Sequence, residues 1–179
     1  MDFLELARQR RSCRKYSSRD LSHQDIEKCL EAVKLAPSAC NSQPWHFIVV
    51  EDKELKNKVA RAAFAGIYSM NSFASAAPVL VIVVRENSKY IAKLGGFLRG
   101  TQYSLIDLGI ACEHFILQAA QQGLGTCWIG FFDEKQVKKV LKISRNKKVD
   151  IIISVGHPAG GLSLGQKKTK PNSEICEFR

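Results

Sequence analysis

Apolar residues recur at helical spacing in five stretches of the chain. The best marked begins after Ser22, a good N-cap residue with Asp25 three positions later, and ends before Pro37. Asp52 and Asp133 stand in the same way before two further helical patterns. A fourth, short pattern lies at the N-terminus, just before a group of arginines. The fifth is the longest and has no such cap.

This longest pattern covers residues 101–122 and is apolar on most of its sides. Gly123 follows it as the expected C-cap. Its polar side chains form one narrow stripe of Asp107, His114, Gln118 and Gln121. We interpret His114 as a hydrogen-bonded structural residue. A helix surrounded by apolar residues is typical of the centre of a fold or of a large subunit interface.

Short apolar segments bounded by turn residues predict four strands. They are HFIVVED at 46–52, PVLVIVV at 78–84, GLGTCWIGFF at 123–132 and VDIIISVGHP at 149–158. The longest apolar run, residues 73–84, lacks alternation and is interpreted as a buried strand. SEICEF at 173–178 is expected to add a short final strand, and residues 85–100 a mobile connection or lid. Helices and strands alternating around one sheet predict an α/β or α+β fold.

Composition favours a single domain spanning residues 1–179, of which 45% are hydrophobic and 25% charged. A chain of this length buries about 70% of its unfolded surface, enough for a sizeable core. No apolar run reaches the roughly 20 residues that cross a bilayer. The N-terminus runs from acidic through apolar to basic residues, which is not the order of a signal peptide. We therefore expect a soluble, cytoplasmic protein with no membrane partner.

The six cysteines form no C-x-x-C pair and have no histidine at metal-ligand spacing. We expect free thiols and no metal site. The net charge is +10, which indicates attraction to an anion: nucleic acid, a membrane surface or a phosphorylated ligand. One basic cluster contains Arg8, Arg10, Arg11, Arg14, Lys15 and Arg19, and a second contains Lys167, Lys168 and Lys170. The clusters lie at opposite ends of the chain.

Two segments carry candidate chemistry. RQRRSCRKY at 8–16 offers guanidinium groups suited to phosphate and a serine hydroxyl, although a basic run is by itself more often a solvated face. APSACNSQPWHFIVV at 36–50 places short hydrogen-bonding side chains in a loop before a strand, where donors can converge on a ligand or satisfy their own turns. Together the two segments favour a ligand site over a solvated basic face or a loop that satisfies its own turns.

These segments, taken in order, resemble the nitroreductase family of FMN-dependent oxidoreductases. The resemblance rests on RRSCRKY, APSACNSQPWHFIVV, GLGTCWIGF, SVGHPAG and the basic tail, and covers nearly the whole chain. The N-x-Q-P-W sequence followed by a strand is its most specific part. It implies an α+β fold with a central mixed or antiparallel sheet flanked by helices. It also implies an intertwined homodimer with FMN at the subunit interface, in which the long apolar helix forms the dimer core.

The resemblance also implies which residues bind FMN. Those matching the contacts to the phosphate and ribityl chain are Arg10, Arg11, Ser12 and Arg14, and those in the tail are Lys168 and Lys170. The loop that lines the flavin from the partner subunit matches Pro37, Ser38 and Asn41. The strand end beside the isoalloxazine ring matches Trp128, Ile129 and Gly130. The Gly130 N–H is the expected donor to flavin N5, although this residue alone would be interpreted as a turn glycine.

The implied reaction needs no catalytic side chain. NAD(P)H passes hydride to the flavin, and an electron-poor acceptor such as a nitroaromatic or a quinone then takes the electrons in a ping-pong sequence. Cys40 and the tail lysines depart from the usual pattern of the family. Because lysine lacks the bidentate fork of arginine, weaker FMN binding is expected.

Two other functions are compatible with the residues. A flavin-binding or storage protein would keep the phosphate contacts without turning over NAD(P)H. A small basic nucleic-acid-binding domain would show aromatic residues interleaved with the basic ones on one face. The chain has no such interleaving, so no nucleic-acid partner is expected.

Overall fold

The computed structural model describes residues 2–86, 100–160 and 167–179. Four strands form one sheet in the order β1-β2-β4-β3, and every neighbouring pair is antiparallel. Their bounds are β1 Trp45–Val50, β2 Val79–Arg85, β3 Gly125–Ile129 and β4 Lys148–Gly156. The prediction of an α+β fold with a mixed or antiparallel central sheet is confirmed, and the sheet is antiparallel throughout.

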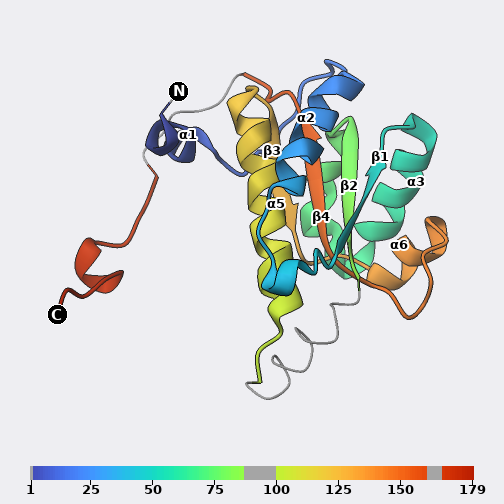
Figure 1. Ribbon diagram of the computed structural model, residues 1–179. Helices are drawn as coiled ribbons and strands as arrows, with labels where there is room; N and C mark the ends of the chain where they lie inside the picture. The colour runs from blue at the N-terminus through green and yellow to red at the C-terminus, as the bar shows by residue number, and fades with distance from the viewer. Residues whose placement is uncertain (1, 87–99, 161–166) are drawn as a thin grey trace.

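Helices cover both faces of the sheet (Figure 1). The α-helices are α1 Phe3–Gln9, α2 His23–Lys34, α3 Lys53–Ala63, α5 Tyr103–Gln121 and α6 Glu134–Val140. The 3₁₀ segments are η1 Ala39–Asn41, η2 Gly66–Ala76 and η3 Asn172–Glu174. Helices α2 and α5 pack on one face, while α3, α6 and η2 pack on the other. The C-terminal segment with η3 extends away from this body on the side of α1 (Figure 1).

The middle strands have apolar residues on both faces because both faces are covered. In β2, Val81 and Val83 pack in the cluster beneath α2 and α5, whereas Leu80 and Ile82 pack in the cluster beneath α3 and α6. All four side chains are fully buried. This burial explains why PVLVIVV shows no alternation of polar and apolar residues.

The three predicted N-caps are confirmed because capping depends on neighbouring residues alone. The side chains of Ser22, Asp52 and Asp133 each accept a hydrogen bond from the backbone N–H three residues later, at 3.2, 2.8 and 3.0 Å. Gly123 ends α5 with φ +75°, and the next N–H donates to the Ala119 carbonyl at 2.9 Å. That pattern is the left-handed cap predicted for this glycine.

Two strand predictions are wrong. Residues 73–76 belong to η2, and the strand begins only at Val79, since Pro78 has no N–H for a ladder. Residues 173–178 form part of η3 and an exposed coil in place of a final strand, because no described sheet edge lies beside them. Arg85 belongs to β2, and most of the expected mobile connection, residues 87–99, lies outside the described residues.

The polar stripe predicted along α5 is divided between two environments. Asp107 is buried and accepts a hydrogen bond from the Ala39 N–H, whereas His114, Gln118 and Gln121 line a groove toward α1. His114 Nδ1 donates to the Ile110 carbonyl at 2.9 Å, as expected of a structural histidine. All six cysteines are free thiols. Over the three described ranges, no helix combines the length and apolar character required to cross a bilayer.

Candidate functional site

The arginine-rich segment after α1 is tied by its backbone to one end of the sheet. Ser12 pairs with Thr126 at the start of β3, and the Cys13 N–H donates to the Thr126 carbonyl at 2.7 Å. Further along, the Ser17 N–H donates to the His157 carbonyl at 2.8 Å. These bonds hold residues 12–17 along the outer edge of β3 and the end of β4.

Two glycines permit this close approach. A Cβ atom on Gly125 would lie 2.7 Å from both Cβ and Sγ of Cys13. A Cβ atom on Gly156 would lie 2.6 Å from Pro78 Cδ and 2.8 Å from Tyr16 Cδ1. Real side chains do not tolerate such distances, so both positions require glycine for the segment to dock.

Tyr16 anchors the far end of the segment. Its hydroxyl lies 2.7 Å from the Ser154 hydroxyl oxygen and donates to the Cys13 carbonyl at 2.9 Å. Burial raises the pKa of the Tyr16 phenol above its usual value, so it remains a neutral donor. The position of the arginines is therefore set by both backbone and side-chain bonds.

Two arginines of this segment place their charges near β3. Burial raises the pKa of the Cys127 thiol, and the positive charges of Arg14 and then Arg10 act against that rise. The Arg14 guanidinium also lies over the Phe73 ring, 5.9 Å from its centroid. Thus η2, to which Phe73 belongs, helps to orient Arg14, a contribution that the sequence analysis missed.

The C-terminal tail brings one lysine to the same cluster. Lys167 Nζ donates to the Ala7 carbonyl at 3.4 Å. Partial desolvation lowers the pKa of Lys167, and the charges of Arg10 and Arg11 lower it further. By contrast, the exposed Lys170 pairs with Glu174 at 3.6 Å within the tail. The structure therefore brings Lys167 to the arginines, whereas the sequence analysis selected its neighbours Lys168 and Lys170.

The cations Arg10, Arg14 and Lys167 have few acidic neighbours, and only the charge of Glu113 acts to raise the pKa of Lys167. In the part of the chain that the structure describes, no carboxylate forms an ion pair with Arg10, Arg14 or Lys167. Ser12, in the same segment, is exposed. Guanidinium and ammonium groups gathered beside a hydroxyl are the donors that phosphate prefers in proteins. The arrangement can hold a phosphorylated ligand.

The outer edge of β3 continues past this cluster without a covering strand. The Thr126 carbonyl faces outward to the arginine segment, so the backbone groups of Trp128 and Gly130 face the same side. Among the described residues, none accepts a hydrogen bond from the Gly130 N–H. Trp128 is 40% exposed, whereas Ile129 is buried in the sheet core. The strand end therefore presents a tryptophan and an available amide beside the cations.

A turn after β3 is held in place by η2. Asn71 Nδ2 donates to the Phe131 carbonyl at 2.8 Å, and the Tyr68 and Phe131 rings lie 4.7 Å apart between centroids. These contacts fix the backbone direction just beyond Gly130. Neither Tyr68 nor Asn71 carried a role in the sequence analysis, since tertiary packing alone brings them to this turn.

The loop at residues 37–43 has an unusual backbone. Cys40, Asn41 and Gln43 adopt positive φ angles of 53°, 48° and 44°. The Gln43 N–H donates to Ser38 Oγ at 2.9 Å, and the Gln43 side-chain amide donates to Asn41 Oδ1 at 3.0 Å. Positive φ angles are unfavourable for residues other than glycine, so this loop has a strained backbone. Such strain is typical of functional loops. Pro37, which precedes them, is exposed.

Within one chain, this loop and the cation cluster lie at opposite ends of the sheet. The loop leads into Trp45, which pairs with Arg85 at one end, whereas Thr126 pairs with Val155 near the other. Figure 1 shows the same separation between η1 and the segment that follows α1. The structure therefore joins the arginines, Lys167 and the end of β3, but leaves Pro37, Ser38 and Asn41 apart from them.

Comparison with known proteins assigns the family. A family model described as "Nitroreductase family" matches residues 7–157. The chain belongs to the nitroreductase family. A relative from Archaeoglobus fulgidus is 38% identical over 159 residues, which cover 87% of this chain and 84% of that protein. The resemblance inferred from the motifs is thereby confirmed.

Other nitroreductases match over almost the full length. The oxygen-insensitive NADPH nitroreductase of Helicobacter pylori strain 26695 is 27% identical, and the match covers 93% of this chain and 92% of that protein. A solved structure titled as an FMN-dependent nitroreductase from Clostridium difficile R20291 is 27% identical with a TM-score of 0.71. That match covers 96% of this chain and 94% of the other. These matches extend the family assignment from residues 7–157 to almost the full chain.

Proposed function

We propose that this protein is an FMN-dependent oxidoreductase that uses NAD(P)H to reduce nitroaromatic, quinone or similar electron-poor acceptors. The observation that carries the proposal is the cluster of Arg10, Arg14 and Lys167 beside the open edge of β3, in which none of the three forms an ion pair with a described carboxylate. FMN ends in a phosphate that such a cluster can bind. The names of the Helicobacter pylori and Clostridium difficile relatives, which mention NADPH and FMN, support the proposal.

Each part of the site has a separate task in this proposal. The phosphate and ribityl chain are held by Arg10, Arg11, Ser12 and Arg14, with Lys167 from the tail and Lys168 and Lys170 near it. Trp128, Ile129 and Gly130 line the ring system, and the free Gly130 N–H donates to it. When bound, FMN supplies hydride acceptance from NAD(P)H and electron transfer to the acceptor in alternating half-reactions. The protein binds and orients, and no side chain acts as acid or base.

The proposal includes a homodimer of single-domain subunits with the site at their interface. A second copy would supply the 37–43 loop, which lies at the wrong end of the sheet within one chain. Exposed apolar side chains on α1 and α5 offer a surface for it: Phe3, Leu4, Leu105 and Ile106. Between these helices lies a groove of about 470 Å³. Burial of this surface would stabilise the dimer.

The visible absorbance spectrum of the purified protein tests the proposed reaction. We expect a flavin spectrum that bleaches when NADH or NADPH is added without air and returns when a quinone is added. A flavin spectrum that does not bleach would favour the flavin-storage alternative. A protein that stays colourless after incubation with FMN would overturn the cofactor assignment.

Sedimentation tests the shared site. We expect a dimer at micromolar concentration, because an exposed apolar surface of this kind is rarely left open to water. Ile106→Glu should yield monomers with weakened FMN retention, because a charge buried in an apolar interface is costly. Ile67→Glu, on η2, is a matched control because Ile67 is also exposed, and it should remain dimeric. A monomeric wild-type protein that still retains FMN would contradict the shared site.

A further inference from the structure

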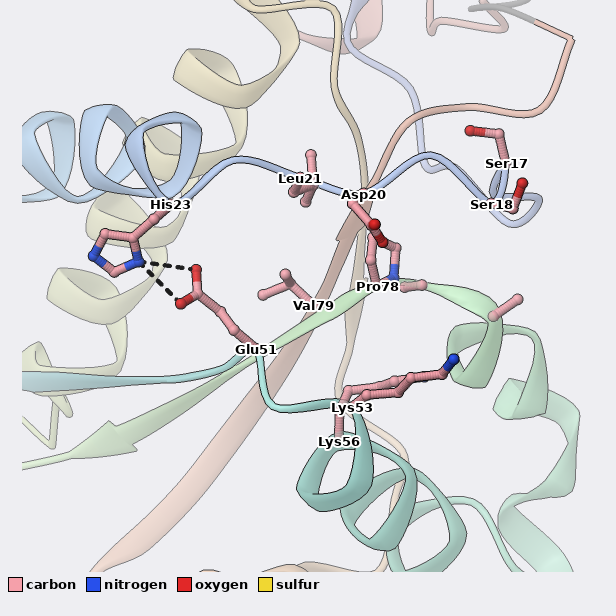
Figure 2. Close-up of a pocket in the computed structure, with 12 residues that line it drawn as sticks. Ser17, Ser18, Asp20, Leu21, His23, Glu51, Lys53, Lys56, Pro78 and Val79 are labelled. Atoms are coloured by element: carbon pink, nitrogen blue, oxygen red, sulfur yellow. Dashed lines mark hydrogen bonds and ion pairs between the residues drawn. The ribbon is translucent and has the colours of Figure 1, made fainter.

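A polar cavity lies outside the residues assigned to the flavin. It has a volume of about 500 Å³ and opens between the segment leading into α2, the start of α3 and the start of β2 (Figure 2). Its lining includes Ser17, Ser18, Asp20, Lys53, Lys56 and Val79. The volume lies within the usual range of small-molecule sites, roughly 300 to 1,000 Å³. None of the residues proposed to bind FMN lines it.

The strongest feature of this cavity is a lysine with little exposed surface. Lys56 is only 7% exposed, and its Nζ donates to the Ser75 carbonyl at 2.7 Å. An ammonium group carries three donors, and no carboxylate forms an ion pair with Lys56 within residues 2–86, 100–160 and 167–179. Burial lowers the pKa of Lys56, and the charge of Lys53 lowers it further. Because only one hydrogen bond of the Lys56 ammonium group is accounted for by Ser75, its other donors can serve an anion in the cavity.

A second lysine reinforces this charge. Lys53 begins α3 and is exposed, and Figure 2 shows its side chain extending in the same direction as that of Lys56. At the start of α3, the Leu55 N–H already donates to Asp52 Oδ1. An anion in this cavity would therefore be bound by the ammonium groups of Lys53 and Lys56. The backbone N–H groups at the start of α3 would not be needed to bind it.

The other polar side chains that line the cavity can form hydrogen bonds with the hydroxyl groups of a ligand. Glu51 is engaged by His23 at 2.9 Å, as the dashed lines in Figure 2 show, and this contact raises the pKa of His23. Asp20 is exposed on the cavity wall and has no partner among the described residues. Its carboxylate can accept hydrogen bonds from hydroxyl groups, and Ser17 and Ser18 can donate or accept. The cavity thus has a cationic end and a hydrogen-bonding wall.

We propose that this cavity is an anion site distinct from the flavin site, which binds a small phosphate monoester carrying hydroxyl groups. The phosphate lies against Lys53 and Lys56. The hydroxyl groups meet Asp20 and the two serines. This site is independent of the proposed oxidoreductase activity, and neither requires the other to be correct.

Calorimetric titration of the protein, saturated beforehand with FMN, tests the proposal with ribose 5-phosphate and inorganic phosphate as probes. We expect saturable binding of both, with ribose 5-phosphate the tighter because of its hydroxyl groups. Lys53→Gln and Lys56→Met should each weaken binding about tenfold, as expected for the loss of one charge-assisted contact. Asp20→Asn should reduce the preference for ribose 5-phosphate without weakening inorganic phosphate.

Two variants separate this site from other basic surfaces. Lys58→Gln removes a charge from the same helix, outside the cavity, and should leave binding unchanged. Arg10→Gln, titrated at an FMN concentration that keeps this variant saturated, should also leave phosphate binding in the cavity unchanged. Weaker phosphate binding by this variant would place the phosphate at the arginine cluster and overturn the proposal. Unaltered binding in Lys53→Gln, whose exposed side chain is dispensable for folding, would overturn it as well. So would the absence of binding by either probe.

Discussion

Replacing Arg10 with glutamine is expected to weaken FMN binding by about ten- to a hundredfold, the loss associated with one charged hydrogen bond. Arg10 affects the pKa values of both Cys127 and Lys167, so its charge lies between the strand and the tail. No other arginine of the segment influences both groups. Fluorescence titration of the apoprotein with FMN measures the change directly.

The tail lysines provide a graded comparison in the same titration. Lys167→Gln should weaken FMN binding severalfold, whereas Lys170→Gln should have less effect because Lys170 is already paired with Glu174. Arg61→Gln removes one exposed charge from α3 and should not change affinity. Equal affinity in Arg10→Gln, Arg61→Gln and wild type would refute the placement of the phosphate at this cluster.

Replacing Gly156 with alanine is expected to lower the free energy of unfolding by about 1 to 3 kcal/mol, the usual cost of overpacking a filled site. The added Cβ would lie 2.6 Å from Pro78 and 2.8 Å from Tyr16. To make room, Tyr16 must move from the Ser154 hydroxyl, and the arginine segment must move with it. FMN affinity should therefore fall although residue 156 touches no part of the proposed cofactor site.

Urea unfolding of the apoprotein measures the first effect. Gly130→Ala is the matched control for stability, because no atom lies within 4 Å of the position its Cβ would take. Its free energy of unfolding should match that of the wild type. If Gly156→Ala were equally stable, residues 12–17 would not be packed against the end of β4 as described.

The two largest expected effects share one cause, which is the docking of the arginine segment onto the sheet. Arg10 and Arg14 have their positions because residues 12–17 form backbone bonds with β3 and with the residues after β4. Glycines at the two closest approaches make those bonds possible. Packing and binding are therefore coupled at this end of the fold, and a change in one should be measurable in the other.

Local features of the chain were predictable from the sequence because their causes lie within a few residues. The caps at Ser22, Asp52 and Asp133 and the glycine at 123 depend on backbone groups three to five positions away. The β2 strand was predictable from its uninterrupted apolar run. The family, too, followed from short motifs whose order along the chain is visible without a structure.

Only the tertiary structure decided which distant groups meet. Residues 173–178 have strand composition, but a strand also needs a neighbour to pair with, and their surroundings offer none among the described residues. Lys167, Lys168 and Lys170 are equivalent as sequence, and the path of the tail alone brings Lys167 to Arg10. The sheet register likewise places the 37–43 loop far from the arginines. Such contacts depend on chain topology and long-range packing, which no local pattern encodes.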